Sequence, residues 1–463
     1  MFRHIKHVHF VGIGGIGMSG IAELLINSGY EISGSDICLS PITARLEKLG
    51  AYISEGHHPK NIGLSDLVVY SSAVKAQNPE LQEANRRKIP CIPRAEILGE
   101  LMRLREGIAI AGTHGKTTTT SMVGKILETA NFDPTIIVGG ILRSLGTTTK
   151  LGQGKFIVVE ADESDKLFLK WSPVITVIAS IDEDHLDQYE NLEEIKETFL
   201  KFTNRVPFYG CNIVCNDDEN IKYIIPRMKK RCITYGFSED SKFKIKDYKL
   251  GETSRFWLQA NGDDLGEFSL SLPGIHNILN ACAAITVGIE LEIPIWTIRK
   301  AVSEFEGAHR RFELKGEKKG IKIMDDYAHH PREIEVTLRT AKQLFSCHSE
   351  INSESHGRII VIFQPHLFSR TQKLSHRFAN CFHDADWTII TSIYPARESP
   401  VPGITGELIV QSAFSAGYKN ISYIPSEQEL IDWCLTNLKP GDTLFTIGAG
   451  DIYKIGELLL EKL

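Results

Sequence analysis

The chain has 463 residues, of which 42% are hydrophobic and 24% are charged, and its formal net charge at pH 7 is −6. These proportions are typical of a globular protein, and at about 150 residues per domain the length predicts roughly three domains. The small negative charge gives no support to binding of nucleic acid or of a membrane surface. No apolar run is long enough for a signal peptide or for insertion into a membrane, so we expect a cytoplasmic protein.

Nine cysteines are scattered along the chain, and no two of them form a C-x-x-C pair. This pattern argues against a disulfide framework and against a zinc site. We expect reduced thiols, most of them buried.

The first motif is a glycine-rich turn. An apolar strand at residues 8–12 runs into GIGGIG, and a helix is expected from about residue 18 to 28. Gly12, Gly14 and Gly17, with Asp36 at the end of the next strand, match the dinucleotide-binding fingerprint. Physically, the pattern predicts a diphosphate on a helix N-terminus with an acid near a sugar, which suits a UDP-sugar as well as NAD.

A strand at residues 66–70 leads into a loop of small residues that begins with Ser71 and Ser72. Ligands bind at the carboxyl ends of strands in an open parallel sheet. The alternation of strands and helices up to about residue 105 indicates a first α/β domain.

The second motif is IAIAGTHGKTTTT at residues 108–120. An apolar strand, two glycines and Lys116-Thr117 predict a strand that enters a helix through a phosphate-binding loop, with the Thr117 hydroxyl available to Mg²⁺. The match is imperfect, because Ile110 occupies the place of the first glycine. The alternative is an ordinary glycine-rich turn before a helix.

Acidic clusters follow two of the strands expected after this loop. The strand at 155–159 ends in Glu160 and further acids, and the strand at 174–181 ends in a cluster that contains His185. Carboxylates at strand ends beside a phosphate loop are suited to Mg²⁺. Each cluster alone could equally be a solvated loop.

An alanine-rich helix opens near residue 274, and Asn277 and Asn280 lie three apart on one face of it. Their amides could read an adenine edge, and Asn277 could instead cap the helix. Arg310 and Arg311 then mark a domain junction, where a paired arginine suits phosphate or carboxylate or is simply a solvated hinge.

A third α/β domain is expected from about residue 312. A strand hairpin leads to DDYAHHP, in which Asp326 could bind a ribose and His329 could face a phosphate. Pro331 is placed to begin a helix. A strand at 358–364 then runs into PHLFSRT, and strands near 388–393 and 443–447 complete the domain.

Eight motifs occur in order: GIGGIGMSG, AGTHGKTTTT, EADESD, DHLD, GIHNILNA, GAHRRF, DDYAHHP and FQPHLFSRT. Together they resemble the Mur ligases of peptidoglycan synthesis over essentially the whole chain, and within that family the branch that acts on UDP-N-acetylmuramate and L-alanine. The resemblance implies three α/β domains: a Rossmann-like UDP-sugar domain at 1–106, a central P-loop ATPase domain with a mainly parallel sheet at 107–312, and a Rossmann-like C-terminal domain at 313–463.

The resemblance also implies a set of site residues, with ATP and Mg²⁺ as cofactors. The UDP-substrate would contact Gly14, Gly15, Ile16, Gly17, Asp36, Ser71 and Ser72. ATP would contact Gly112, Thr113, His114, Gly115, Lys116, Thr117, Thr118, Asn277, Asn280, Arg311 and Asp326. The metal would be held by Thr117, Glu160 and His185, the amino acid by His366 and Arg370, and catalysis would involve Lys116, His185, His329 and Arg370.

The family reaction forms an acyl phosphate on the lactyl carboxylate of the muramyl nucleotide, and an amino acid then attacks it to give an amide, ADP and phosphate. The expected partners are therefore UDP-N-acetylmuramate and L-alanine, with no nucleic acid, in a monomer or homodimer.

Two departures from the family's sequence pattern bear on substrate binding. Leu367 stands where the family commonly has arginine, and residues 144–150 read SLGTTTK where an asparagine–alanine pair is expected.

Several alternatives remain. A recycling ligase that joins a whole tripeptide to the same nucleotide is the nearest. Folate polyglutamylating ligases share the central loop but do not need the first domain. An NAD-dependent oxidoreductase would explain Gly12, Gly14, Gly17 and Asp36 but not the second phosphate loop. A nucleotide-switch protein would explain Lys116 and Thr117 but not the histidines and Arg370 of the third domain.

Overall fold

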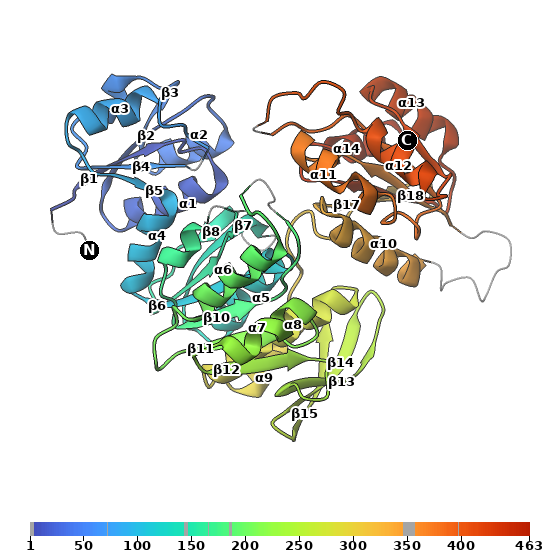
Figure 1. Ribbon diagram of the computed structural model, residues 1–463, viewed down its shortest axis with the longest axis horizontal. Helices are drawn as coiled ribbons and strands as arrows, with labels where there is room; N and C mark the ends of the chain where they lie inside the picture. The colour runs from blue at the N-terminus through green and yellow to red at the C-terminus, as the bar shows by residue number, and fades with distance from the viewer. Residues whose placement is uncertain are drawn as a thin grey trace. The chain divides into compact units, whose positions relative to one another are not determined.

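Three sheets form the framework of the protein in the computed structural model, which describes residues 4–71, 73–142, 147–164, 166–184, 188–345, 357–396 and 398–463 (Figure 1). Helices alternate with the strands of each sheet. The expected α/β class with three sheet-based domains is confirmed.

The first sheet has the strand order β3-β2-β1-β4-β5, and every pair in it is parallel. Its strands are β1 (His7–Val11), β2 (Glu31–Asp36), β3 (Tyr52–Glu55), β4 (Leu67–Tyr70) and β5 (Cys91–Pro93), and its helices are α1 (Ile16–Asn27), α2 (Pro41–Lys48), α3 (Pro79–Arg86) and α4 (Arg94–Arg103). The chain runs outward from β1 through β2 to β3 and then returns to the other side of β1 as β4. The loops after β1 and β4 therefore flank a topological switch point, where ligands bind in such sheets.

The second sheet has ten strands in the order β15-β14-β13-β12-β11-β10-β6-β9-β7-β8. Its strands are β6 (Glu106–Ala111), β7 (Thr135–Leu142), β8 (Thr147–Lys150), β9 (Phe156–Glu160), β10 (Ile175–Ile178), β11 (Cys211–Cys215), β12 (Cys232–Gly236), β13 (Phe243–Lys249), β14 (Ser254–Ala260) and β15 (Asp263–Leu270). Its helices are α5 (Lys116–Thr129), α6 (Leu192–Thr203), α7 (Glu219–Ile224), α8 (Ile275–Glu290) and α9 (Ile295–Ser303). The strands β6 and β10 are buried throughout except at Glu106, as expected of central parallel strands covered on both faces.

The third sheet has the order β16-β17-β21-β18-β19-β20 and is parallel except for the hairpin of β16 and β17. Its strands are β16 (Glu313–Lys318), β17 (Ile321–Asp326), β18 (Ile359–Phe363), β19 (Trp387–Ile390), β20 (Ile421–Tyr423) and β21 (Thr443–Ile447). Its helices are α10 (Pro331–Phe345), α11 (Phe368–Phe378), α12 (Glu407–Ser415), α13 (Glu427–Asn437) and α14 (Tyr453–Lys462). The hairpin and the helix that begins at Pro331 were both expected from the sequence.

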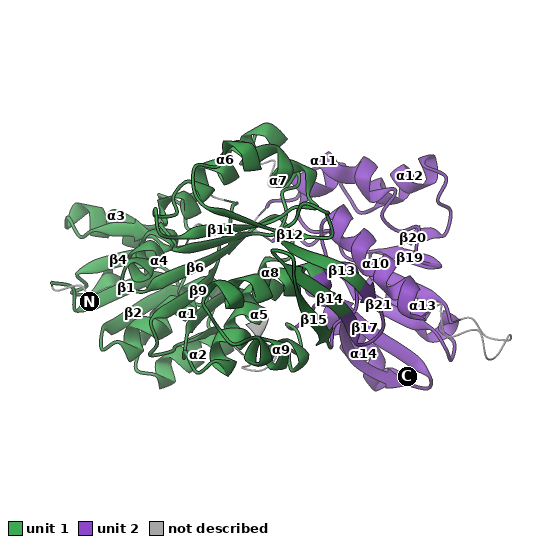
Figure 2. Cartoon of the chain, turned by 90° about the horizontal axis from the view of Figure 1, so that it is seen from below, with its two compact units in different colours: residues 1–247, 256–270, 279–308 green, residues 248–255, 271–278, 309–463 purple. Residues whose placement is uncertain are grey.

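The chain divides into two compact units (Figure 2). One contains residues 1–247, 256–270 and 279–308, and the other contains residues 248–255, 271–278 and 309–463. The proposed domain boundaries at 106/107 and 312/313 stay a prediction.

Eight cysteines fall within the described residues, and all eight are free thiols. Five of them are buried, namely Cys211, Cys215, Cys282, Cys381 and Cys434. Burial raises the pKa of Cys211 to about 12, so this thiol stays protonated at neutral pH.

Among the described helices, none combines the length and the apolar character needed to cross a bilayer.

Candidate functional site

The loop between β6 and α5 has the backbone shape of a phosphate-binding loop. Gly112 has φ +133° and Gly115 has φ +82°, a region that glycine enters at little cost. A Cβ at Gly112 would lie 2.8 Å from the backbone nitrogen of Ser180, so the close approach also requires glycine. The amide of Thr113 donates to the Ser180 carbonyl at 3.0 Å, and the His114 amide donates to the Ser180 hydroxyl at 2.8 Å.

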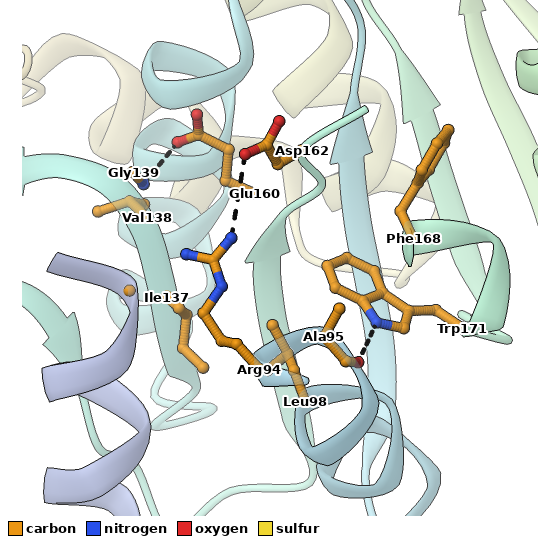
Figure 3. A pocket seen from close by; sticks show the side chains of 11 residues that line it. Arg94, Ala95, Leu98, Ile137, Val138, Gly139, Glu160, Asp162, Phe168 and Trp171 are labelled. Atoms are coloured by element: carbon orange, nitrogen blue, oxygen red, sulfur yellow. Dashed lines mark hydrogen bonds and ion pairs between the residues drawn. The ribbon is translucent and has the colours of Figure 1, made fainter. Parts of the chain in front are cut away.

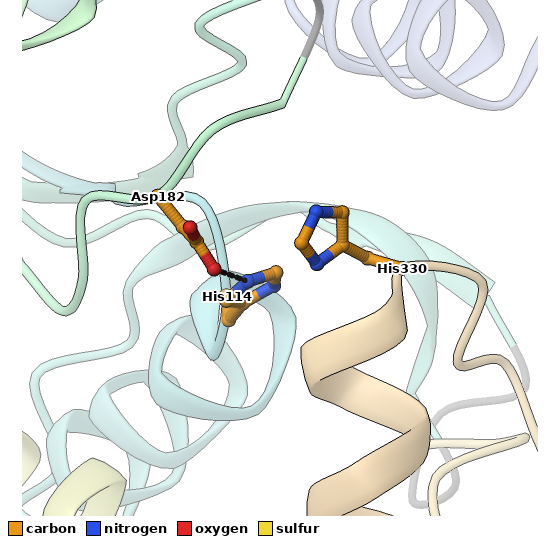
Figure 4. A group of neighbouring side chains, drawn as sticks. All are labelled: His114, Asp182 and His330. Carbon is orange, nitrogen blue, oxygen red and sulfur yellow. Dashed lines mark hydrogen bonds and ion pairs between the residues drawn. The ribbon is translucent and has the colours of Figure 1, made fainter. Parts of the chain in front are cut away.

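These contacts explain why β10 is shorter than the strand expected at 174–181. The strand ends at Ile178, because Ser180 bonds to the phosphate loop instead of continuing the ladder. The amide of Asp182 in turn donates to the Thr113 hydroxyl at 2.8 Å. The His114 ring lies 3.4 Å from the Asp182 carboxylate (Figure 4). The two loops are therefore fixed to each other.

Helix α5 begins at Lys116 directly after Gly115, and no side chain caps its first turn. The first-turn N–H groups and the helix dipole make such an end a site for an anion. Thr113, Lys116, Thr117 and Thr118 all lie in this loop or first turn, as the sequence predicts.

Lys116 forms an ion pair that the sequence did not single out. Its ammonium lies 2.9 Å from both carboxylate oxygens of Glu163 and donates to the carbonyl of Gly112 at 2.6 Å. Burial alone would lower the pKa of Lys116, but the negative charges of Glu163, Glu160 and Asp162 outweigh it and raise the pKa. The lysine is therefore charged, and its ammonium is held against the loop by Gly112 and Glu163.

Two of the predicted metal ligands are brought together. The Thr117 hydroxyl donates to Glu160 Oε2 at 2.9 Å, and the amide of Gly139 donates to the same oxygen at 2.8 Å. A hydroxyl and a carboxylate are the oxygen donors that Mg²⁺ prefers, so these residues fit the ion. The third predicted ligand, His185, lies outside the described residues.

The two asparagines of α8 have different surroundings. Asn280 Oδ1 accepts from the Thr119 hydroxyl at 3.2 Å, and a Cβ at Gly115 would lie 2.5 Å from this oxygen. Asn280 therefore supports the phosphate loop. Asn277 is the third residue of α8, so it does not stand at the N-cap position, and its side-chain amide donates to the Pro273 carbonyl at 2.7 Å. Adenine recognition by either residue stays a prediction.

The first glycine-rich loop is shaped by Asp36. The Gly14 amide donates to Asp36 Oδ2 at 2.8 Å, so this carboxylate holds the loop. Gly15 precedes the first residue of α1, Ile16, and no side chain caps the helix. Ser71 follows β4, and its amide donates to the Val11 carbonyl at 3.2 Å. Ser72 lies outside the described residues.

A pocket of about 210 Å³ lies beside these elements in the same unit (Figure 3). Its lining includes Gly17, Arg94 and Glu160. Arg94 extends from the start of α4 toward Asp162, with 3.9 Å between the charged groups, and a Cβ at Gly17 would lie 2.1 Å from the guanidinium. The pocket thus places a cation against the first turn of α1, although no local motif identified Arg94.

In the other unit, Asp326 is buried at the end of β17. It accepts hydrogen bonds from the amides of Phe312 and Ala328, both at 2.8 Å. Burial raises its pKa to about 6, and the positive charge of Arg311 opposes that rise.

The paired arginines of the junction have separate surroundings. Arg310 binds the Asp325 carboxylate at 2.8 Å and the carbonyls of Gly448 and Gly450, so it is a structural residue of the third sheet. Arg311 lies over the ring of Tyr327, 5.3 Å from its centroid.

His329, His366 and Arg370 gather at the carboxyl edge of the third sheet. The rings of His329 and His366 are 5.7 Å apart, and Arg370 Nη1 lies 3.4 Å from His366 Nδ1. The structure thus brings together the residues predicted to contact the amino acid. Leu367, between them, is buried and has φ +68°.

Comparison with known proteins identifies the family. Three family models match: "Mur ligase family, catalytic domain" at residues 7–106, "Mur ligase middle domain" at 110–288 and "Mur ligase, glutamate ligase domain" at 310–450. A UDP-N-acetylmuramate–L-alanine ligase of Geobacter sp. (strain M21) is 50% identical over 100% of this chain and 99% of its own length.

Solved structures agree with this result. The UDP-N-acetylmuramate-alanine ligase of Thermotoga maritima is 31% identical, with a TM-score of 0.81 over 99% of both chains. A murein peptide ligase of Psychrobacter arcticus shares the fold, with a TM-score of 0.71 and 24% identity over 98% of both chains. The chain belongs to the Mur ligase family.

Proposed function

We propose that the protein uses ATP to join L-alanine to the lactyl carboxylate of UDP-N-acetylmuramate. The proposal rests on one observation above all. The phosphate loop with Lys116, Thr117 and Glu160 occurs in a chain that is 50% identical, along its whole length, to a UDP-N-acetylmuramate–L-alanine ligase. The proposed reaction is a step of peptidoglycan precursor synthesis.

A carboxylate is a poor acyl donor, because its leaving group would be oxide. Transfer of the γ-phosphoryl group of ATP to the lactyl carboxylate makes phosphate the leaving group, and the amine of alanine then displaces it. Charge develops on the transferring group and later on the tetrahedral oxyanion, and fixed positive charge stabilises both. In this proposal Lys116 supplies that charge, and two observations support the role: its ammonium contacts the phosphate loop, and its pKa is raised.

Thr117 and Glu160 would hold Mg²⁺ through their oxygens. When bound, the ion supplies further positive charge to the phosphate oxygens. The hydrogen bond between these two residues keeps both side chains in place at the first turn of α5.

Gly14, Gly15, Ile16, Gly17 and Ser71 would receive the nucleotide sugar at the switch point of the first sheet. Arg94 adds a cation beside this loop. When the substrate binds, the Arg94 guanidinium would leave Asp162 and pair with an anionic group of the substrate. At the third sheet, Arg370 would bind the carboxylate of alanine, with His366 as a second donor.

The test is an incubation with ATP, Mg²⁺ and UDP-N-acetylmuramate, with product masses measured for L-alanine and for the L-Ala–D-Glu–diaminopimelate tripeptide in separate reactions. The proposal predicts a product that carries one alanine and little or no product with the tripeptide. A product formed only with the tripeptide would assign the protein to the recycling ligases instead.

A further inference from the structure

Four aromatic rings form a row along the carboxyl edge of the third sheet. Tyr327 and His329 follow β17, His366 follows β18, and Tyr394 follows β19. Successive ring centroids are 5.6, 5.7 and 5.9 Å apart. The first three rings belong to motifs recognised in the sequence, whereas Tyr394 does not, so its place in the row needs an explanation.

Tyr394 is tied to His366 through the backbone as well as through its ring. The Tyr394 amide donates to the Pro365 carbonyl at 2.8 Å, and the Leu367 amide donates to the Tyr394 carbonyl at 3.0 Å. These two bonds make an isolated parallel bridge between His366 and Tyr394. The rings stack with an angle of 14° between their planes. The backbone bridge therefore fixes where the tyrosine ring meets the imidazole.

A glycine beyond β21 holds the tyrosine ring from another direction. A Cβ at Gly450 would lie 2.6 Å from Tyr394 Cγ and 2.2 Å from Gln364 Oε1. Gln364 is itself held, because its side-chain Nε2 donates to Asp451 at 3.0 Å and its Oε1 accepts from the Ile452 backbone amide at 3.2 Å. A methyl group at Gly450 would therefore displace both the Gln364 side chain and the Tyr394 ring.

The ring nitrogens of His366 have defined roles in this arrangement. Arg370 can only donate, so His366 Nδ1 must accept at the 3.4 Å contact and the proton of the neutral ring resides on Nε2. In the proposed function, an amino-acid carboxylate would accept from that N–H. Its direction depends on the plane of the imidazole, and the stacked Tyr394 ring restrains that plane.

We propose that Tyr394 is a positioning residue for amino-acid binding, which orients the Nε2–H of His366 by stacking on its ring. The inference rests on the proposed function, in which His366 and Arg370 bind the carboxylate of L-alanine. Tyr394 acts through its ring face, so its hydroxyl is not required.

The test measures KM for each of the three substrates in the full-length chain. Tyr394→Leu should raise KM for L-alanine at least about tenfold, because a small misplacement of a binding group has effects of this size, and should leave KM for ATP and for the nucleotide sugar within about twofold. Tyr394→Phe keeps the ring and should restore the KM for alanine. Tyr52→Leu, which alters an exposed tyrosine of the first sheet, is the matched control.

Gly450→Ala provides a second route to the same result, since its methyl group displaces the Tyr394 ring, together with the Gln364 side chain, without removing the ring. It should also raise KM for alanine, and thermal unfolding of each variant will show that the chain is folded. Alanine-dependent turnover with an unchanged KM for alanine in both Tyr394→Leu and Gly450→Ala would overturn this inference alone. No alanine-dependent turnover by the unaltered chain would overturn the proposed function and this inference with it.

Discussion

The ion pair of Lys116 and Glu163 joins the phosphate loop to the loop after β9. Their side chains are only 15% and 3% exposed, so removal of one partner leaves the other charge buried and unpaired. We expect Lys116→Met to lower the free energy of unfolding by about 3 kcal/mol and to abolish ATP-dependent turnover. Denaturant unfolding and phosphate release measure the two effects separately.

The double variant Lys116→Met/Glu163→Gln separates stability from catalysis. Neutralising Glu163 removes the unpaired charge, so most of the lost stability should return while turnover stays absent. Near-normal turnover in either variant would contradict the role assigned to Lys116.

The raised pKa of Asp326 leads us to expect that the stability of the protein depends on pH. Its pKa is about 6 in the folded protein against an ordinary value of 3.8, because the carboxyl group is buried. Between these two values the folded chain binds more protons than the unfolded chain, so this group's stabilising contribution is complete at low pH and is lost as the pH rises through about 6. The asparagine in Asp326→Asn cannot titrate. The melting temperature of this variant minus that of the unaltered protein should therefore be larger at about pH 7 than at about pH 4.5. A difference that does not change with pH would show that Asp326 does not titrate in this range.

At the scale of elements, the turn between β6 and α5 depends on Gly115. A Cβ there would meet Asn280 at 2.5 Å on a backbone with φ +82°. We expect Gly115→Ala to lower kcat/KM for ATP at least about tenfold, because either the loop or the Asn280 side chain that supports it must shift. Gly50→Ala is the matched control, since Gly50 has φ +104° but nothing within 4 Å of its Cβ position. Equal effects of the two substitutions on ATP kinetics would argue against a specific role for the loop geometry.

The order of strand, glycine loop and helix was predictable because each part has a local sequence signal: an apolar run, two glycines, and the Lys-Thr pair that follows them. The same holds for the hairpin of β16 and β17 and for the helix at Pro331. Positions of side chains within these elements were less predictable. Asp36 was expected near a sugar, yet its carboxylate also holds the Gly14 amide.

Residues that meet only through tertiary packing carried no local signal. Arg94 is separated from Gly17 by most of the first sheet, and Tyr394 is 28 positions from His366 along the chain, yet each lies against its partner. Glu163 belonged to a recognised acidic motif, but no spacing rule selects it over Glu160 as the partner of Lys116. Such pairings depend on strand order, which a local pattern does not encode.

Across the whole molecule, each sheet contributes one part of the proposed reaction at the carboxyl ends of its parallel strands. The first sheet presents Gly14 and Ser71, the second presents Lys116 and Glu160, and the third presents His366. Loops at this edge are free to carry ligand-binding groups while the buried strands hold the fold. In the proposed function, a single type of architecture would thus serve the nucleotide sugar, the phosphates and the amino acid.

The most direct test of the account follows the oxygen atoms of the lactyl carboxylate. UDP-N-acetylmuramate labelled with ¹⁸O in that carboxylate is incubated with the protein, ATP, Mg²⁺ and L-alanine, and the released phosphate is analysed by mass. Activation by phosphoryl transfer predicts phosphate release that requires both the nucleotide sugar and alanine, with one ¹⁸O atom in each phosphate formed. Release of unlabelled phosphate, or release independent of alanine, would contradict it.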